Sequence, residues 1–295
     1  MSKRRKASAQ RGGAPARSAK VRDVFVARPF EGLVDEAEWI ALRELVPAAT
    51  APLTLAPRYA EQYGDRSITV ATVLPMAWPA LTKPDGRVLV GLQRNTHSGD
   101  ASRDVALAVL LALEAEPGTS VTMPVTPGPG KRLQDVLADV PLDVTVRDGF
   151  EFWLDDEATE DPDVRASLER ANASVYPTVR MAAARGAYWC RVPDRAHLRW
   201  VLPDDEDAAL NTLARLQAGG DLALGDGTKF AGMFRAHGRL VPVWDLPERP
   251  AGEEWEQPFA DFVKRYADAL AAGGVLTSDE RRARQGLIGR QVTLR

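Results

Sequence analysis

One pattern occurs twice along the chain and limits the folds that are open to it. Each copy has two short apolar β segments that meet near a Gly-Arg dipeptide, then a loop, then a helix, and the copies lie in residues 67–116 and 229–271. Hairpins combined with helices are typical of α+β proteins. The sequence therefore predicts an α+β fold of two similar halves, each a mostly antiparallel sheet packed with helices.

The two copies also share a register of 152 residues. A tandem duplication explains such an offset. The alternative stays open that two unrelated α+β halves contain hairpins and helices in the same order. The matched positions are Trp78 and Phe230, Gly86-Arg87 and Gly238-Arg239, Leu92 and Trp244, Leu107 and Phe259, and Leu110 and Phe262.

The spacing of apolar residues predicts the individual elements. Helices are expected at 35–46, 103–116, 133–137, 164–173, 204–216 and 257–271, and a capping box of Thr277 and Glu280 predicts one more helix. Strands are expected at 23–28, 67–74, 87–92, 120–125, 143–154, 187–192, 197–202, 229–235 and 240–246. We interpret 67–74 and 87–92 as an antiparallel pair, because a turn sequence precedes the second segment.

Composition divides the chain into five segments. Residues 155–163 are acidic and rich in helix breakers, which indicates a boundary between the halves. The segments are a disordered basic arm at 1–20, a first α+β domain at 21–154, an acidic linker and helix at 155–180, a second α+β domain at 181–274, and a short basic C-terminal helix or tail at 275–295.

Apolar runs and cysteine usage exclude several classes of protein. No stretch approaches the roughly 20 apolar residues of a membrane span, and no apolar region of a secretory signal follows the basic N-terminus. Cys190 is the single cysteine, which excludes an intrachain disulfide and any multi-cysteine zinc or iron–sulfur site. We expect a soluble cytoplasmic protein without a cofactor and without a membrane partner.

The N-terminal arm is the clearest feature for binding a partner. It holds seven of the 38 basic residues and no acid, which leaves 31 basic against 41 acidic residues in the rest of the chain. A flexible cationic segment attracts phosphate-rich polymers through counterion release, although the acidic remainder opposes tight binding. The candidate nucleic-acid or anion-binding residues are Lys3, Arg4, Arg5, Lys6, Arg11, Arg17 and Lys20.

Three histidines are the main candidates for reactive side chains. None has a metal-ligand partner at helical or hairpin spacing, so no metal site and no catalytic residue is assigned. His97 lies in a polar loop that suits a general base, and His237 lies in a predicted turn. His197 shares a strand face with Arg195 and Arg199, an arrangement that suits an anion. Simple exposure to solvent is the alternative explanation for each.

Other motifs point away from specialised chemistry. The Gly-rich run 126–132 lacks the spacing of a phosphate-binding loop, and its prolines remove amide donors. The acidic run 155–163 lacks the spacing of a calcium loop. Cys190 is expected to behave as a small buried hydrophobe, and most tryptophans are expected to pack in the core.

The start of the folded region, residues 21–53, resembles a family of actinobacterial proteins of about this length that carries only an uncharacterised-domain label. The run RPFEGLVDEAEWIALRELVPAATAPL at 28–53 is the specific part. The similarity extends through most of the chain after the arm. The resemblance implies no activity, ligand or catalytic residue.

Three functional hypotheses remain. The first is a non-enzymatic cytoplasmic binding or adaptor protein with a protein partner, because hairpin-and-helix halves present surfaces rather than a reactive pocket. The second is an RNA-associated or ribosome-associated factor that acts through the arm. The third is an enzyme with a noncontiguous site near His97 or in the groove between the halves. Histidines and carboxylates gathered in one cavity would contradict the first.

Overall fold

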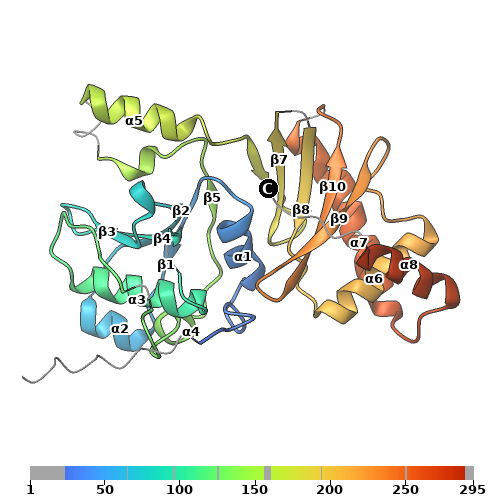
Figure 1. The fold of residues 1–295 in the computed structure, drawn as a ribbon, viewed down its shortest axis with the longest axis horizontal. Helices are drawn as coiled ribbons and strands as arrows, with labels where there is room; N and C mark the ends of the chain where they lie inside the picture. The colour runs from blue at the N-terminus through green and yellow to red at the C-terminus, as the bar shows by residue number, and fades with distance from the viewer. Residues whose placement is uncertain are drawn as a thin grey trace, which may run out of the picture.

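The chain forms two five-stranded sheets that lie side by side along the long axis of the molecule (Figure 1). A computed structural model describes residues 24–64, 66–95, 97–124, 126–155, 161–193, 195–249 and 251–289. Both sheets are mostly antiparallel and both are packed with helices. The predicted α+β fold class is confirmed.

The first sheet has the strand order β3-β4-β2-β1-β5. Strands β2 and β4 run parallel, so the antiparallel pairing predicted for them is wrong. The reason is β3, because the chain reverses from β2 into β3 and reverses again into β4, which lies between them. The strands are β1 (Ala49–Leu53), β2 (Ile68–Val73), β3 (Ala80–Thr82), β4 (Val88–Gln93) and β5 (Thr145–Val146).

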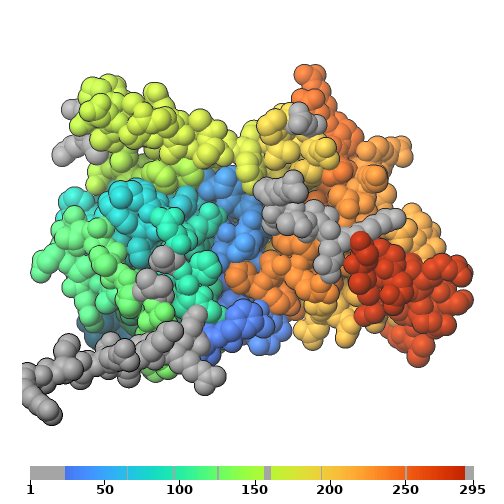
Figure 2. Space-filling model, in the orientation of Figure 1, coloured from blue at the N-terminus to red at the C-terminus, as the bar shows by residue number. Residues whose placement is uncertain are grey.

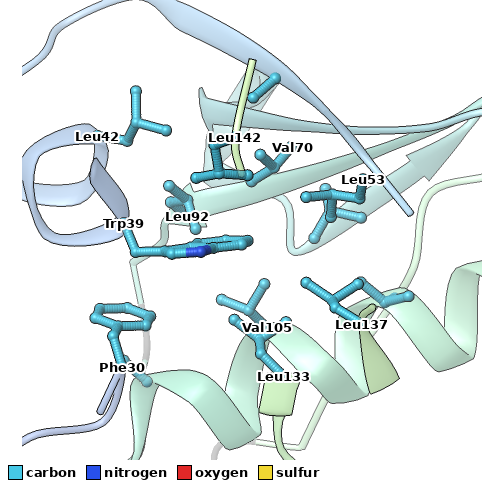
Figure 3. Close-up of a cluster of buried hydrophobic side chains, with 14 of the residues drawn as sticks. Phe30, Trp39, Leu42, Leu53, Val70, Leu92, Val105, Leu133, Leu137 and Leu142 are labelled. Atoms are coloured by element: carbon cyan, nitrogen blue, oxygen red, sulfur yellow. The ribbon is translucent and has the colours of Figure 1, made fainter. Parts of the chain in front are cut away.

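Four α-helices belong to the first half: α1 (Glu36–Glu44), α2 (Pro57–Tyr63), α3 (Ala101–Glu114) and α4 (Leu133–Val136). Helix α3 is apolar nearly all round and packs against β3 and β4. Figure 3 shows Trp39 of α1 reaching into the core between Leu92 of the sheet and Val105 of α3. The apolar side of α1 thus joins the helices to the sheet.

The second sheet has the order β6-β7-β8-β10-β9 and is antiparallel throughout. Phe259 and Phe262 of α7 pack edge-on against Trp200 of β8. The elements are β6 (Thr178–Arg180), β7 (Ala187–Val192), β8 (Arg195–Trp200), α6 (Glu206–Gly219), β9 (Lys229–Ala236), β10 (Arg239–Leu246), η4 (Gly252–Trp255) and α7 (Glu256–Ala272).

Helix α8 (Ser278–Ile288) follows and packs on α6. Its N-cap is the predicted capping box, because the Thr277 hydroxyl accepts a hydrogen bond from the Glu280 amide at 3.3 Å. Leu287 is buried, and the guanidinium of Arg284 donates to Asp207 at 2.8 Å. The basic C-terminal helix therefore folds back on the acidic start of α6.

The hairpin-and-helix units β3-β4-α3 and β9-β10-α7 keep the 152-residue offset, and the order β3-β4-β2-β1 of the first sheet corresponds to β9-β10-β8-β7 of the second, whereas the fifth strands β5 and β6 come at different points of the chain. They differ in direction, since β4 is parallel to its inner neighbour β2, whereas β10 is antiparallel to its inner neighbour β8. The edge hairpin thus has opposite orientations in the two sheets. The tandem duplication stays a prediction.

Three predicted strands are wrong or shortened. Residues 24–28 form no strand. The Val26 amide donates a hydrogen bond to the Gly99 carbonyl at 2.8 Å. Residues 120–124 hold one isolated bridge, and 143–154 keep β5 and the short helix η2 (Glu151–Trp153). Alternating apolar residues form a strand only beside another strand edge, which a local pattern does not report.

The acidic linker predicted at 155–180 contains α5 (Pro162–Asn172) and β6. Helix α5 buries no residue and lies along the top of the molecule in Figure 1, on the connection between the sheets. Strand β6 pairs with β7 and so belongs to the second sheet. Residues 156–160 lie outside the described residues.

The two halves share one apolar cluster. Tyr188, Val201, Ala236 and Val241 of the second half pack in the same core as Trp39. Polar contacts reinforce this junction at the start of α1. From the sequence, the acidic residues there are explained only by their favourable interaction with the helix dipole. Three ion pairs cross from the second half to this end: Arg185 with Asp35, Arg239 with Glu36, and Arg180 with Glu38.

Candidate functional site

A cavity of about 740 Å³ opens where the two halves meet. Four segments form its wall: residues 25–29, the C-terminal end of α1, the end of β4 with the loop after it, and the tip of the β9–β10 hairpin. Figure 2 shows the blue segment after residue 24 beside the orange hairpin. The polar lining residues are Arg43, Glu44, Gln93, Arg94, His97, Ser98 and His237.

His237 enters the cavity wall from the hairpin tip. His237 and Gly238 both have positive φ, 48° and 80°, as a two-residue type I′ turn requires, so the predicted turn is confirmed. A Cβ on Gly238 would lie 3.0 Å from the Cβ of Arg28. The imidazole packs edge-on against Phe30, with ring centroids 5.3 Å apart. The tip is therefore held firmly against the N-terminal segment.

Glu44, the last residue of α1, orients this imidazole. The Nε2 atom of His237 lies 2.8 Å from Oε1 of Glu44. Burial raises the pKa of Glu44, but its hydrogen bond with His237 and the charges of His237, Arg43 and His97 outweigh burial, so its pKa lies below the ordinary value. In a neutral imidazole, this carboxylate acceptor favours the tautomer with hydrogen on Nε2, which leaves Nδ1 as an acceptor.

Two buried arginines form the inner side of the cavity. The Arg94 side chain is 5% exposed and pairs with Asp104 at 2.6 Å. Arg43 donates from Nη1 to the Leu92 carbonyl at 2.5 Å and lies 3.3 Å from Glu44. Burial lowers the pKa of both guanidinium groups more than these carboxylates raise it. The Nε atom of Arg43 makes the ion pair with Oε1 of Glu44, and among the described residues the Nε atom of Arg94 has no hydrogen-bond acceptor.

The loop after β4 presents His97 at the cavity. Ser98 fixes this loop, because its amide and its hydroxyl each donate to the Asp104 carboxylate at 2.8 Å. Asp100 starts α3 by accepting a hydrogen bond from the Arg103 amide at 3.2 Å. Ser98, Asp100 and Asp104 are thus occupied by structural contacts. His97 lies beside them and is exposed.

The structure brings two of the three histidines together and leaves the third elsewhere. Nothing in the sequence couples His97 with His237, because their separation of 140 residues carries no helical or strand period. His197 lies on β8, with Nδ1 3.0 Å from Asp245. Burial and the nearby Arg199 lower its pKa, although Asp245 opposes them. It shares the less buried strand face with Arg195 and Arg199, as predicted.

The remaining sequence candidates do not add to the cavity. Cys190 is buried, and burial raises the pKa of its thiol. Within the described ranges, no three His, Cys, Asp or Glu side chains gather as metal ligands, and no helix has the length and hydropathy of a membrane crossing. The seven basic residues of the arm lie outside the described residues: Lys3, Arg4, Arg5, Lys6, Arg11, Arg17 and Lys20.

Fold and cavity together define an α+β protein whose two sheet-and-helix halves share a core and enclose a polar cavity. The chain matches the sequence model of a family of unknown function (DUF5926) over residues 29–295, and it belongs to that family. The expected membership in an uncharacterised family is confirmed, whereas the actinobacterial origin stays a prediction. No curated protein and no solved structure matches the chain.

Proposed function

We propose that the protein binds a small molecule through an anionic group in the cavity between its halves. The observation that carries the proposal is the convergence of two guanidinium groups and two imidazoles on one cavity. Arginine is suited to this task, because its planar donors match the oxygens of carboxylates and phosphates. Large pockets with converging polar groups are the usual sites of ligand binding.

The charge balance of the site supports an anionic ligand. Glu44 and Asp104 face the guanidinium groups of Arg43 and Arg94, but they offset the burial of these charges only in part. A ligand oxygen would supply further negative charge and would accept hydrogen bonds in an environment where charge-assisted bonds are strong.

The three histidines provide a direct test. Imidazole signals of the full-length protein can be followed by NMR during titration with inorganic phosphate, after assignment with His97→Gln, His197→Gln and His237→Asn variants. We expect the His97 and His237 signals to shift and saturate together. His197 lies on β8 beside Asp245 and does not line the cavity, so it serves as the internal control. Its signal is expected not to shift.

Two results would contradict the proposal. One is the absence of any saturable shift at His97 and His237 up to roughly 50 mM phosphate, a concentration high enough to detect binding with a dissociation constant of several millimolar. The other is an equal shift at all three histidines, which would indicate a general effect of ionic strength rather than a site.

The Glu44–His237 pair favours a second candidate, an enzyme that uses His237 as a general base. A carboxylate that holds one imidazole nitrogen and leaves the other as an acceptor is an arrangement that supports proton abstraction. If the protein is such an enzyme, a ligand identified by titration is converted to product over hours of incubation with the wild-type protein. The His237→Asn variant is expected to bind this ligand without converting it. A ligand that stays intact with the wild-type protein argues for binding alone.

The other hypotheses remain predictions. The adaptor hypothesis depends on surfaces rather than a reactive pocket. The cavity therefore makes the binding of a small molecule the better supported role. Association with RNA or the ribosome through residues 1–20 concerns a segment outside the described residues. A cytoplasmic location likewise remains a proposal.

A further inference from the structure

The cavity is too large for an inorganic anion alone. Its volume of about 740 Å³ falls within the range of roughly 300–1,000 Å³ that is usual for pockets of organic ligands. The two guanidinium groups account for recognition of one end of such a ligand. The remaining lining therefore has to be searched for groups that recognise the rest of it.

The character of the lining changes from the inner wall to the rim. Arg94 is almost completely buried, whereas Phe25 lines the same cavity and is 82% exposed. Exposed large hydrophobic side chains within the described ranges are Val24, Phe25, Met76, Val140 and Val275, and Phe25 is the aromatic member of this set. An exposed aromatic ring at the mouth of a cavity is a feature of ligand recognition rather than of core packing.

The backbone that carries Phe25 is fixed in place. The Val26 amide donates to the Gly99 carbonyl at 2.8 Å. A Cβ on Gly99 would lie 2.7 Å from the Val24 carbonyl oxygen and 2.8 Å from the Cα of Phe25, so the two backbones touch. Residues 24–26 thus rest directly on the loop that carries His97. The ring of Phe25 is held beside the cationic groups even though its side chain faces solvent.

We infer that the ligand combines an anionic group with a planar aromatic ring, and that Phe25 stacks on this ring. This inference rests on the proposed function, because the arginines and histidines are taken to hold the anionic group. A nucleoside phosphate and an aromatic carboxylate share the required chemistry. Stacking of a base on an aromatic side chain strengthens binding about tenfold or more.

Calorimetric titration of the full-length protein separates the contributions of the two groups. The probes are inorganic phosphate, ribose 5-phosphate, adenosine monophosphate, indole-3-acetate and adenosine. We expect one or both of the aromatic anions to bind about tenfold more tightly than ribose 5-phosphate. Adenosine, which has the ring without the charge, is expected to bind weakly. Comparison of adenosine monophosphate with indole-3-acetate distinguishes the two sources of the aromatic anion.

Substitutions at Phe25 assign the aromatic preference to this ring. Phe25→Ala is expected to weaken the preferred aromatic anion about tenfold and to leave ribose 5-phosphate unchanged, with Phe25→Trp restoring affinity. Met76→Ala removes a side chain that is 77% exposed and does not line the cavity, so it is the matched control. Circular dichroism checks that each variant is folded.

The outcomes distinguish the two proposals. If phosphate and ribose 5-phosphate bind as tightly as the aromatic anions, or if Phe25→Ala weakens every probe equally, the aromatic inference is wrong and the anion site stands. If no anionic probe binds, both proposals are wrong. If Met76→Ala has the same effect as Phe25→Ala, the change reflects the surface in general and the role of Phe25 is wrong.

Discussion

The two ends of helix α1 meet the second half of the chain in opposite ways. At the N-terminal end, Glu38 is completely buried and accepts hydrogen bonds from Arg180 at 2.7 Å and from the Tyr188 hydroxyl at 2.5 Å. At the C-terminal end, Glu44 meets His237 at the edge of a cavity. One end of the helix joins the halves, and the other leaves room for a ligand.

This comparison separates polar residues that stabilise the fold from those available for function. Both ends combine carboxylates with arginines, so residue type alone does not distinguish them. What differs is the space beside the pairs: at the closed end the ion pairs join the two halves across the junction, whereas at the open end Arg43, Glu44 and Arg94 line a cavity. Charged side chains that line a cavity are the ones that a ligand can reach, and such a cavity indicates a functional site.

The largest expected effect belongs to the closed end. Glu38→Ala leaves Arg180 and the Tyr188 hydroxyl without their buried acceptor, and breaking a buried pair from one side lowers the free energy of unfolding by about 3–5 kcal/mol. Urea denaturation measures this change. Glu31→Ala is the control, since this exposed partner of Arg28 is expected to change stability by no more than about 0.5 kcal/mol. Equal effects of the two variants would show that Glu38 stabilises the fold no more than an exposed ion pair does, and the closed end would lose its structural role.

An intermediate effect is expected where the N-terminal segment rests on the loop. Gly99→Ala places a methyl group 2.7 Å from the Val24 carbonyl oxygen, and the resulting strain lowers the free energy of unfolding by about 1–3 kcal/mol. Thermal unfolding of the full-length protein measures it. Gly225→Ala has no neighbour within 4 Å and is expected to have little effect. A Gly99→Ala protein as stable as the Gly225→Ala protein would show that residues 24–26 are not fixed on the loop.

The smallest effect, at the open end, depends on pH. The pKa of Glu44 is lower in the folded chain than its ordinary value, so its interactions add stability above about pH 4.3, and this stability is lost as the pH falls through the lower folded value. Glu44→Gln is expected to lower the free energy of unfolding by about 0.2–1 kcal/mol at pH 7. The difference from wild type is expected to shrink in acid.

Urea denaturation at pH 7 and at about pH 3.5 tests this dependence. Glu169→Gln, on the exposed side of α5, is a matched control for the loss of one carboxylate. A difference between wild type and Glu44→Gln that does not change with pH would mean that the carboxylate of Glu44 does not act through its charge.

Most helices and four of the five strands of the second sheet could be predicted from the sequence, because they depend on local periodicity and caps, whereas β6 was not predicted. Helices α1, α3, α6 and α7 have strong apolar spacing, and Thr277 caps α8 as its sequence indicates. The parallel pairing of β2 with β4 could not be predicted in this way, since it depends on where β3 lies in the sheet. Strand direction is a property of the connection and not of the strand.

The sequence indicates the candidate site only coarsely, as a noncontiguous site near His97 or in the groove between the halves. His97 was identified as a polar loop residue and His237 as a turn residue, and both assignments are correct locally. Their shared cavity arises because the β9–β10 tip reaches the end of α1, a contact between residues 44 and 237. Arg43 carries no signal in the sequence, because an arginine near the end of an amphipathic helix is common on exposed surfaces.

The apolar cluster common to both halves has a consequence for how the chain can be divided. Tyr188, Val201, Ala236 and Val241 complete a core whose other members lie before residue 147. If the chain were cleaved at the α5 connection and the fragments separated, each fragment would expose apolar surface that is buried in the intact chain. We therefore expect the halves to unfold as a single cooperative unit, and a ligand that contacts both in the cavity would stabilise their association further.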